Sequence, residues 1–354
     1  MINVARASTR LFDVRARAPL RLGLAGGGTD LSPYCDQFGG AVLNATIDRF
    51  AFAHIAPSPD GDIAFRARDL GAEEHFTDFD KIGLDDGLIL HRAVYRHVVE
   101  TWLGGEAPAL TVSTTIDAPA GSGLGSSSAL AVALIEAFRV ALDLPLGPYD
   151  IARLAFDIER VKLGLAGGRQ DQYAATFGGV NYIEFLAEER VLVSPLRVPR
   201  AFLNELESSL VICFTGQSRA SAGIIEEQIK GLVDMDPETV SNMHSLKADA
   251  TAMREAILQG KVREVAEILM RSWAAKKRTA KGIATATVDR LFDHGLANGA
   301  WGGKVSGAGG GGFLMFCTDP ENRYRLTSAL NDAGGQASSV KFTFDGVEAW
   351  SVPR

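Results

Sequence analysis

The chain has 354 residues, of which 46% are hydrophobic, and its formal net charge at pH 7 is −7. This length and apolar content suffice for one large or two medium domains, and the acidic balance argues against a nucleic-acid-binding protein. The N-terminal arginines are not followed by the apolar segment of a secretory signal and no stretch is apolar enough to span a membrane, so we expect a soluble, cytoplasmic protein.

The first half of the chain alternates strand-like and helical segments. Residues 40–57 and 109–116 are rich in β-branched and aromatic residues and are predicted strands. Residues 126–142 contain no glycine or proline, so they predict a buried helix that serines would cap. A second helix is predicted at 149–163, ending at Gly164.

The second half is predicted to be mainly helical. Two prolines and a polar tail in residues 194–208 favour a domain boundary there, dividing the chain into 1–197 and 198–354. Strands and helices are mixed without a βαβ rhythm, so we expect an α+β fold. The predicted strands are 180–186, 190–194, 209–214, 313–317 and two within 338–350, and the predicted helices are 219–232, 238–259, 262–274, 284–298 and 320–333.

A glycine-rich loop precedes the predicted helix 126–142. Glycines let the backbone approach a ligand closely, and the start of a helix presents free N–H groups and a positive dipole end to an anion. The loop therefore predicts a phosphate site rather than only a tight turn, although it is not a Walker A loop because no lysine follows the glycines. The predicted nucleotide-binding residues are Gly121, Ser122, Gly123, Leu124, Gly125, Ser126, Ser127 and Ser128.

Another glycine cluster contains a formal G-x-G-x-x-G from Gly307 to Gly312. A dinucleotide-binding fingerprint should be followed by a helix, whereas here a strand-like segment follows. This order argues against a nicotinamide oxidoreductase. We expect instead a glycine loop that packs over another loop near a ligand.

The order and spacing of these clusters resemble the GHMP kinases. The phosphate-loop pattern of that family is similar to Pro119–Ser127, with one extra residue after the proline, and its C-terminal glycine motif is similar to Lys304–Gly312. The resemblance implies a domain like ribosomal protein S5 domain 2 followed by a ferredoxin-like domain, with ATP and the acceptor in the cleft between them. A homo-oligomer is compatible with the sequence, which does not fix the oligomeric state.

Within that family the chain most resembles the D-glycero-D-manno-heptose 7-phosphate kinases. The resemblance rests on residues 17–30, 38–48, 166–179 and 299–304, and Trp301 departs from it. It implies that ATP phosphorylates the anomeric hydroxyl of the heptose 7-phosphate to give the 1,7-bisphosphate, for nucleotide-activated heptose and surface polysaccharide. The alternatives are another sugar-1-kinase, such as a fucokinase or galactokinase, and a non-catalytic sugar sensor on the same fold.

The resemblance also implies a role for individual residues. Asp171 would be the catalytic base and Arg21 would bridge it to the transferring phosphoryl group. Ser127 and Glu159 would hold Mg²⁺, with Ser126 and Ser128 as rivals to Ser127. The predicted acceptor-binding residues are Gly28, Thr29, Asp30, Arg169, Gly307 and Gly309.

A second phosphate on the acceptor requires a further cationic pocket. Guanidinium groups suit bidentate capture of phosphate, so Arg169, which lies in the same loop as Asp171, is the leading candidate. Arg219 and the run Lys276–Arg278 are alternatives, although a basic run is commonly a solvated surface.

Overall fold

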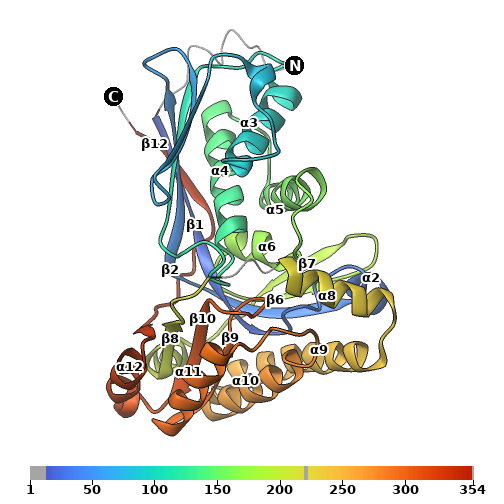
Figure 1. The fold of residues 1–354 in the computed structure, drawn as a ribbon, viewed down its shortest axis with the longest axis vertical. Coiled ribbons are helices and arrows are strands. Elements are labelled where there is room, and N and C mark those ends of the chain that lie inside the picture. Colours follow the sequence, from blue (N-terminus) through green and yellow to red (C-terminus); the bar gives the residue numbers. More distant parts are fainter. Residues whose placement is uncertain (1–12, 219–221, 353–354) are drawn as a thin grey trace.

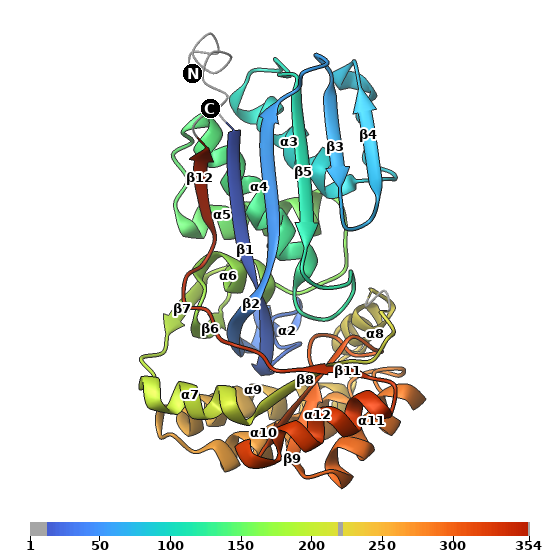
Figure 2. The ribbon, with the colours of Figure 1, turned by 90° about the vertical axis from the view of Figure 1, so that its left-hand side faces the viewer.

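Two β-sheets organise the chain in a computed structural model that describes residues 13–218 and 222–352. The first sheet has the order β12-β1-β2-β5-β3-β4, and β6 joins β2 to β7. Its long strands β1 and β2 run the length of the upper lobe in Figure 2 and continue toward the lower one. Its strands are β1 (Asp13–Ala25), β2 (Gly40–Pro57), β3 (Ile63–Ala67), β4 (Ala72–Phe76), β5 (Leu110–Ile116), β6 (Val180–Phe185), β7 (Val191–Pro195) and β12 (Glu348–Val352).

The second sheet forms the centre of the lower lobe and has the order β11-β8-β10-β9, with every neighbouring pair antiparallel. Helices cover it on the outside of the molecule (Figure 1). Its strands are β8 (Leu210–Phe214), β9 (Ala300–Val305), β10 (Phe313–Thr318) and β11 (Gln336–Ser338).

The helices divide between the two lobes in chain order. The first group lies along one side of the first sheet in Figure 1, and the second group includes helices that pack on the second sheet and a helix that packs on β1 and β2 of the first. The first group is α2 (Tyr34–Phe38), α3 (Ile89–Trp102), α4 (Ser126–Leu142), α5 (Pro148–Phe156) and α6 (Gln170–Phe177). The second group is α7 (Arg200–Ser209), α8 (Ala222–Val233), α9 (Pro237–Leu258), α10 (Val262–Lys276), α11 (Ala286–Ala297) and α12 (Arg323–Asp332).

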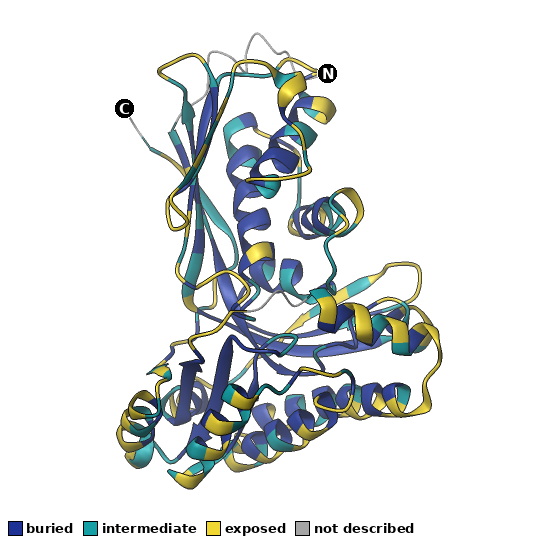
Figure 3. Cartoon of the chain, in the orientation of Figure 1, coloured by how far each residue is buried: buried dark blue, intermediate teal, exposed yellow. Residues whose placement is uncertain are grey.

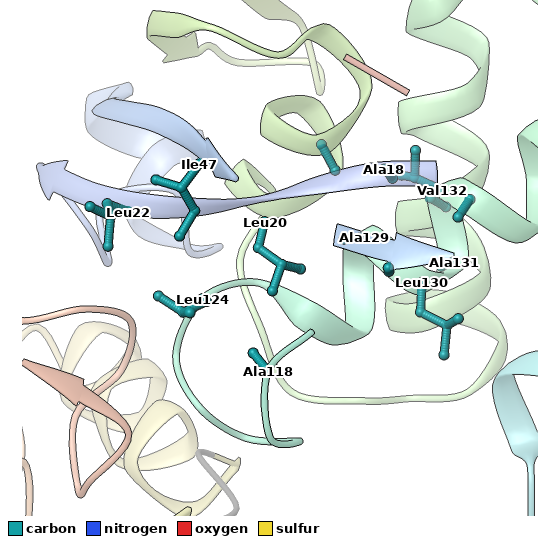
Figure 4. Packing of buried hydrophobic residues seen from close by; sticks show 14 of the residues in the cluster. Ala18, Leu20, Leu22, Ile47, Ala118, Leu124, Ala129, Leu130, Ala131 and Val132 are labelled. Carbon is teal, nitrogen blue, oxygen red and sulfur yellow. The ribbon is translucent and has the colours of Figure 1, made fainter. Parts of the chain in front are cut away.

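Helix α4 is the central helix of the first lobe. Nearly all of its side chains are buried, as Figure 3 shows, because it packs between the sheet and the other helices. Leu124, just before the helix, joins the same apolar cluster as Leu20 and Leu22 of β1 (Figure 4). This packing fixes the glycine-rich loop against β1 and so positions the start of α4.

Most of the predicted elements are confirmed, and several that carry a weak pattern were missed. The bounds of helix 126–142 are correct, whereas the predicted helix 149–163 is α5 followed by a π-helical segment, Asp157–Lys162. Segment 194–208 is not an irregular linker, because the apolar side chains of α7 are buried. The elements missed were β1, α2, β3, β4, α3, α6, α7 and β9.

The two strands predicted within 338–350 lie mostly outside that range, since one ends at Ser338 and the other begins at Glu348, and they belong to different sheets. β11 pairs with β8, but β12 returns to the first sheet, where Asp13 of β1 faces Val352. The predicted boundary near residue 197 lies between β7 and α7 and remains a prediction. No helix among residues 13–218 and 222–352 is long and apolar enough to cross a membrane.

Candidate active site

A cavity of about 340 Å³ lies where the loops of the two lobes meet. Four glycine-rich segments line it: the loop after β1, the phosphate loop before α4, the loop before α6 and the loop between β9 and β10. The sequence thus distributes these glycines over the whole chain, and the fold collects them around one space. The predicted base Asp171 and four predicted acceptor-binding residues line the cavity, and these four are Gly28, Asp30, Gly307 and Gly309.

The start of α4 faces this cavity. Gly125 is the N-cap residue with φ at +76°, a left-handed conformation that favours glycine. The serine cap expected from the sequence is wrong: within the described structure no side chain caps α4, and the hydroxyls of Ser127 and Ser128 donate to Glu159 instead. The first N–H groups of the helix therefore stay available to an anionic ligand.

The loop between β9 and β10 packs directly on the phosphate loop. The amide of Phe313 donates to the Ser122 carbonyl at 3.0 Å, and the Ser306 hydroxyl donates to the Gly123 carbonyl at 3.0 Å. A Cβ at Gly123 would lie 2.3 Å from the Ser306 carbonyl oxygen, so only glycine permits this approach. The glycines stand between two strands rather than before a helix, which confirms the loop-on-loop interpretation and excludes the dinucleotide fingerprint.

The carboxylate of Glu159 is buried beside the first residues of α4. Its π-helical segment brings it to the serines, and such insertions into helices are frequent at functional sites. Ser127 and Ser128 each donate a hydroxyl hydrogen bond to it at 2.7 Å, and the Gln172 amide donates at 2.6 Å. These neutral donors compensate part of the negative charge of a side chain that has no exposed surface.

The pair Ser127 and Glu159 fits a magnesium ion in its chemistry. Both supply oxygen, the ligand atom Mg²⁺ prefers, and Ser127 is exposed toward the cavity. The nearest cationic side chain is Arg160, whose guanidinium stands 3.9 Å from the carboxylate. A divalent cation beside Glu159 would therefore meet a buried carboxylate whose hydrogen-bond partners are mainly uncharged.

Arg21 and Asp171 form an ion pair in the cavity wall. Arg21 Nε donates to Asp171 Oδ1 at 2.7 Å and Nη2 lies 2.5 Å from the same oxygen. A further nitrogen of Arg21 donates to the Gly123 carbonyl of the phosphate loop at 2.5 Å. The arginine is buried, whereas the Asp171 side chain is 21% exposed, so one carboxylate oxygen remains open to the cavity.

Asp30 ties two loops together. Its carboxylate accepts from the amides of Gly28, Arg169 and Gln170 at 2.9–3.1 Å and from the Gln170 side chain at 3.1 Å. Four hydrogen bonds match the full acceptor capacity of a carboxylate. Asp30 therefore shapes the cavity through the backbone around it, and its predicted contact with sugar hydroxyls would have to replace one of these bonds.

Two predicted acceptor-binding residues are not placed to serve that role. The Thr29 hydroxyl is fully buried and bonds to the carbonyls of Gly26 and Ala41, so it fastens the loop to β2. The Arg169 guanidinium stacks over Phe156 and faces Asp36 at 3.6 Å, outside the cavity lining. Neither side chain lines the cavity in this structure, so both roles stay predictions; a loop residue can point to either side of its backbone, and the sequence does not state which.

Two buried lysines line the cavity, and their position there could not be predicted from the sequence. Lys276 closes α10 and donates to the Gly27 carbonyl at 3.0 Å, while Lys304 of β9 donates to the Gly23 carbonyl at 2.9 Å. Burial lowers the pKa of Lys276 to about 8 and that of Lys304 to about 7. Lys277 and Arg278 are exposed, and Arg219 lies outside the described residues.

Comparison with known protein families shows that the chain matches both domains of one kinase family. The GHMP kinases N terminal domain matches residues 89–179, and the GHMP kinases C terminal domain matches residues 253–336. The matched regions contain the phosphate loop, Glu159, Asp171, both lysines and the last glycine cluster.

Several individual proteins are similar to this chain. A D-glycero-alpha-D-manno-heptose 7-phosphate kinase of Campylobacter jejuni is 41% identical over 339 residues, which cover 96% of this chain and 99% of that protein. An L-fucokinase/L-fucose-1-P guanylyltransferase of Bacteroides fragilis is 29% identical, covering 92% of this chain and 37% of that protein. The crystal structure of a D-glycero-D-manno-heptose 1-phosphate kinase from Bacteriodes thetaiotaomicron superposes with a TM-score of 0.82 at 39% identity, covering 96% of this chain and all of that one.

Proposed function

Because the chain belongs to the GHMP kinases, with the two-domain α+β fold of that family, we propose that it phosphorylates the anomeric hydroxyl of D-glycero-D-manno-heptose 7-phosphate with ATP. The observation that carries this proposal is the Arg21–Asp171 pair, which stands beside the phosphate loop with one carboxylate oxygen open to the cavity. The product would be the 1,7-bisphosphate.

The phosphate loop would bind the triphosphate of ATP. Its glycines let the backbone approach the phosphates, and the free N–H groups at the start of α4 donate to anionic oxygens. Since Arg21 donates to the carbonyl of Gly123 in this loop, the cation is placed next to the expected position of the γ-phosphoryl group. There its charge would offset the negative charge that builds up during transfer.

Asp171 would orient and deprotonate the acceptor hydroxyl. The oxygen of that hydroxyl forms a bond to the γ-phosphorus as the bond to the β-phosphate oxygen of ATP breaks, and ADP leaves. The hydroxyl proton passes to the Asp171 carboxylate. The bond from Arg21 keeps the carboxylate turned toward the phosphate loop, so that base and phosphate meet at one point.

Ser127 and Glu159 would hold magnesium beside the phosphates. When bound, the ion would neutralise phosphate charge and orient the transferring group. The side chains of Ser128 and Gln172 fix the Glu159 carboxylate, so its orientation does not depend on the ion.

The identity of the sugar is the most specific part of the proposal. It rests on the 41% identity with a heptose 7-phosphate kinase over nearly the full chain. The similar crystal structure is named as a heptose 1-phosphate kinase, and that name puts the phosphate at carbon 1, the position at which this proposal places the accepting hydroxyl. The fucokinase relative is less similar and supports a sugar-1-kinase acting on an unphosphorylated sugar.

The decisive experiment is a coupled ADP-release screen over four acceptors. We would compare heptose 7-phosphate, heptose 1-phosphate, unphosphorylated heptose and L-fucose, and determine the phosphorylated position by ³¹P NMR. The proposal expects the highest kcat/KM with heptose 7-phosphate and a new anomeric phosphate signal. Faster turnover of L-fucose, or phosphate appearing at carbon 7, would refute it.

The biological setting remains a prediction of the same proposal. A cytoplasmic enzyme of this activity would supply a sugar bisphosphate for nucleotide-activated heptose and surface polysaccharide. Size-exclusion chromatography with light scattering would establish whether the enzyme forms a homo-oligomer.

A further inference from the structure

We propose that Lys276 and Lys304 together form the binding site for the phosphate group that the acceptor already carries. This inference rests on the proposed function, because it assumes a phosphorylated acceptor. It replaces Arg169, whose guanidinium lies outside the cavity lining.

The two ammonium groups are placed on the acceptor side of the cavity. Lys276 Nζ bonds to Gly27 and lies against Gly28, where a Cβ would be only 3.1 Å away. Lys304 Nζ bonds to Gly23 in the same segment. The neighbouring lining residues on this side come from α8 and α9 and are Ile225, Gln228 and Leu246. Both ammonium groups therefore contact backbone carbonyls of β1 and of the loop that follows it, and this loop carries the predicted acceptor-binding residues.

Each ammonium group has unused capacity to bind an anion. An ammonium offers three donors, and within the described residues each of these two donates one hydrogen bond, to a backbone carbonyl. Neither forms an ion pair in residues 13–218 and 222–352, although both side chains are more than nine-tenths buried. A buried charge without a counter-charge is unfavourable, so this arrangement is suited to an anion that arrives with the substrate.

The surrounding charges fit the same interpretation. Burial is the main cause that lowers the pKa of both lysines. At Lys276 the charge of Asp30 partly opposes this and Arg21 adds to it, while at Lys304 the charges of Lys276 and Arg21 add to it and Asp249 partly opposes it. The Asp30 carboxylate is already saturated by four hydrogen bonds. A phosphate dianion would supply the missing negative charge to both lysines at once. Lys276 also lies in the last turn of α10, where the helix dipole favours a cation.

The test compares phosphorylated and unphosphorylated heptose in Lys276→Met and Lys304→Met. Methionine is unbranched and one atom shorter than lysine, so it keeps most of the apolar packing while removing the charge. A charge-assisted hydrogen bond corresponds to roughly a tenfold to hundredfold change in affinity, so each variant should lower the kcat/KM preference for the phosphorylated sugar by about that factor. Lys277→Met is the matched control, since Lys277 is exposed and lies outside the cavity lining, and it should retain the preference.

Two results would overturn the site. An equal loss with both sugars would indicate that the lysines act on ATP or on the fold, and a large rise in the KM for ATP would indicate the γ-phosphoryl group as their ligand. Thermal unfolding of each variant monitors the fold, and Lys304→Gln, which retains a donor for the Gly23 carbonyl, is a second variant if methionine prevents folding.

Calorimetric binding of heptose 7-phosphate without ATP separates this inference from the proposed function. Tight binding to the wild-type enzyme without phosphoryl transfer would refute the proposed function alone. Binding that stays equally tight in Lys276→Met and Lys304→Met would overturn the lysine site alone. We expect the affinity to fall roughly tenfold to hundredfold in each variant.

Discussion

Replacing Asp171 with asparagine tests the centre of the proposed mechanism. Asparagine keeps the size of the side chain and one oxygen, so the hydrogen bond that Arg21 Nε donates to Oδ1 can persist. The change removes the negative charge and the proton acceptor. Arg21 keeps its bond to the Gly123 carbonyl, and the phosphate loop should stay in place.

The expected loss is much larger in rate than in stability. Loss of a general base typically lowers kcat by about 10²–10⁴, which is roughly 3–5 kcal/mol of transition-state stabilisation. A hydrogen bond to a charged partner contributes about 1.5–3 kcal/mol and a neutral one about 0.5–1.5 kcal/mol. The free energy of unfolding should therefore fall by only about 1–2 kcal/mol.

Three measurements distinguish these effects. ADP release at saturating ATP gives kcat, the thermal shift produced by ATP reports nucleotide binding, and denaturant unfolding gives the stability. Asp157→Asn is a matched control, because Asp157 also pairs with an arginine, Arg153, at 2.9 Å but lies outside the cavity lining. A kcat within about threefold of wild type in Asp171→Asn would remove Asp171 from the mechanism, since base loss costs far more.

Three further predictions concern the metal, a glycine and pH. Ser127→Ala combined with Glu159→Gln should raise the Mg²⁺ concentration needed for half-maximal rate by a larger factor than it raises the KM for the sugar. Full activity of the wild-type enzyme in EDTA without added metal would refute the assignment. Gly168→Ala should lower the melting temperature and raise the sugar KM, because its Cβ would lie 1.9 Å from Asp30 Oδ2, whereas Gly223→Ala in α8 meets no atom within 4 Å and should be harmless. Burial lowers the pKa of Lys304 to about 7 and that of Lys276 to about 8, in the presence of the charges of Arg21, Asp30 and Asp249. Both lysines should therefore lose their charge between pH 7 and 9, and heptose 7-phosphate should bind more weakly as the pH rises through this window. In the ligand-free protein the same lowered pKa values mean that the unfolded chain binds more protons than the folded one, so the free energy of unfolding should increase as the pH rises from about 7 toward 10.5. Calorimetric titration tests the predicted loss of binding, and thermal melts test the predicted gain in stability; a change in the opposite direction would contradict the corresponding prediction.

The phosphate loop and α4 could be predicted because their signal is local. The glycines from Gly121 to Gly125, the serines and the uninterrupted apolar run are contiguous in the sequence, and each has a direct conformational meaning. Asp171 and Arg21 were reachable only through the family resemblance, since nothing local indicates that they pair across 150 residues.

The direction of individual side chains could not be predicted in the same way. Arg169 follows cavity-lining residues in the sequence, but its guanidinium lies over Phe156. Lys304 lies within a glycine motif, but its ammonium group bonds to the Gly23 carbonyl. The burial of a lysine depends on the packing of distant elements, here β9 against β1. The partner of the final strand is likewise set by tertiary structure, so residues 338–350 gave no sign that β12 pairs with β1.

The pairing of β12 with β1 bears on how the protein folds during synthesis. Residues 13–17 pair with residues 348–352, which the ribosome adds more than 300 residues later. Until then β1 has one unpaired edge, and an unpaired strand edge is a site where another chain can add. Because contacts so distant in sequence form slowly, the first lobe can complete its sheet only after the second lobe has been made, and the nascent chain is exposed to aggregation during that interval.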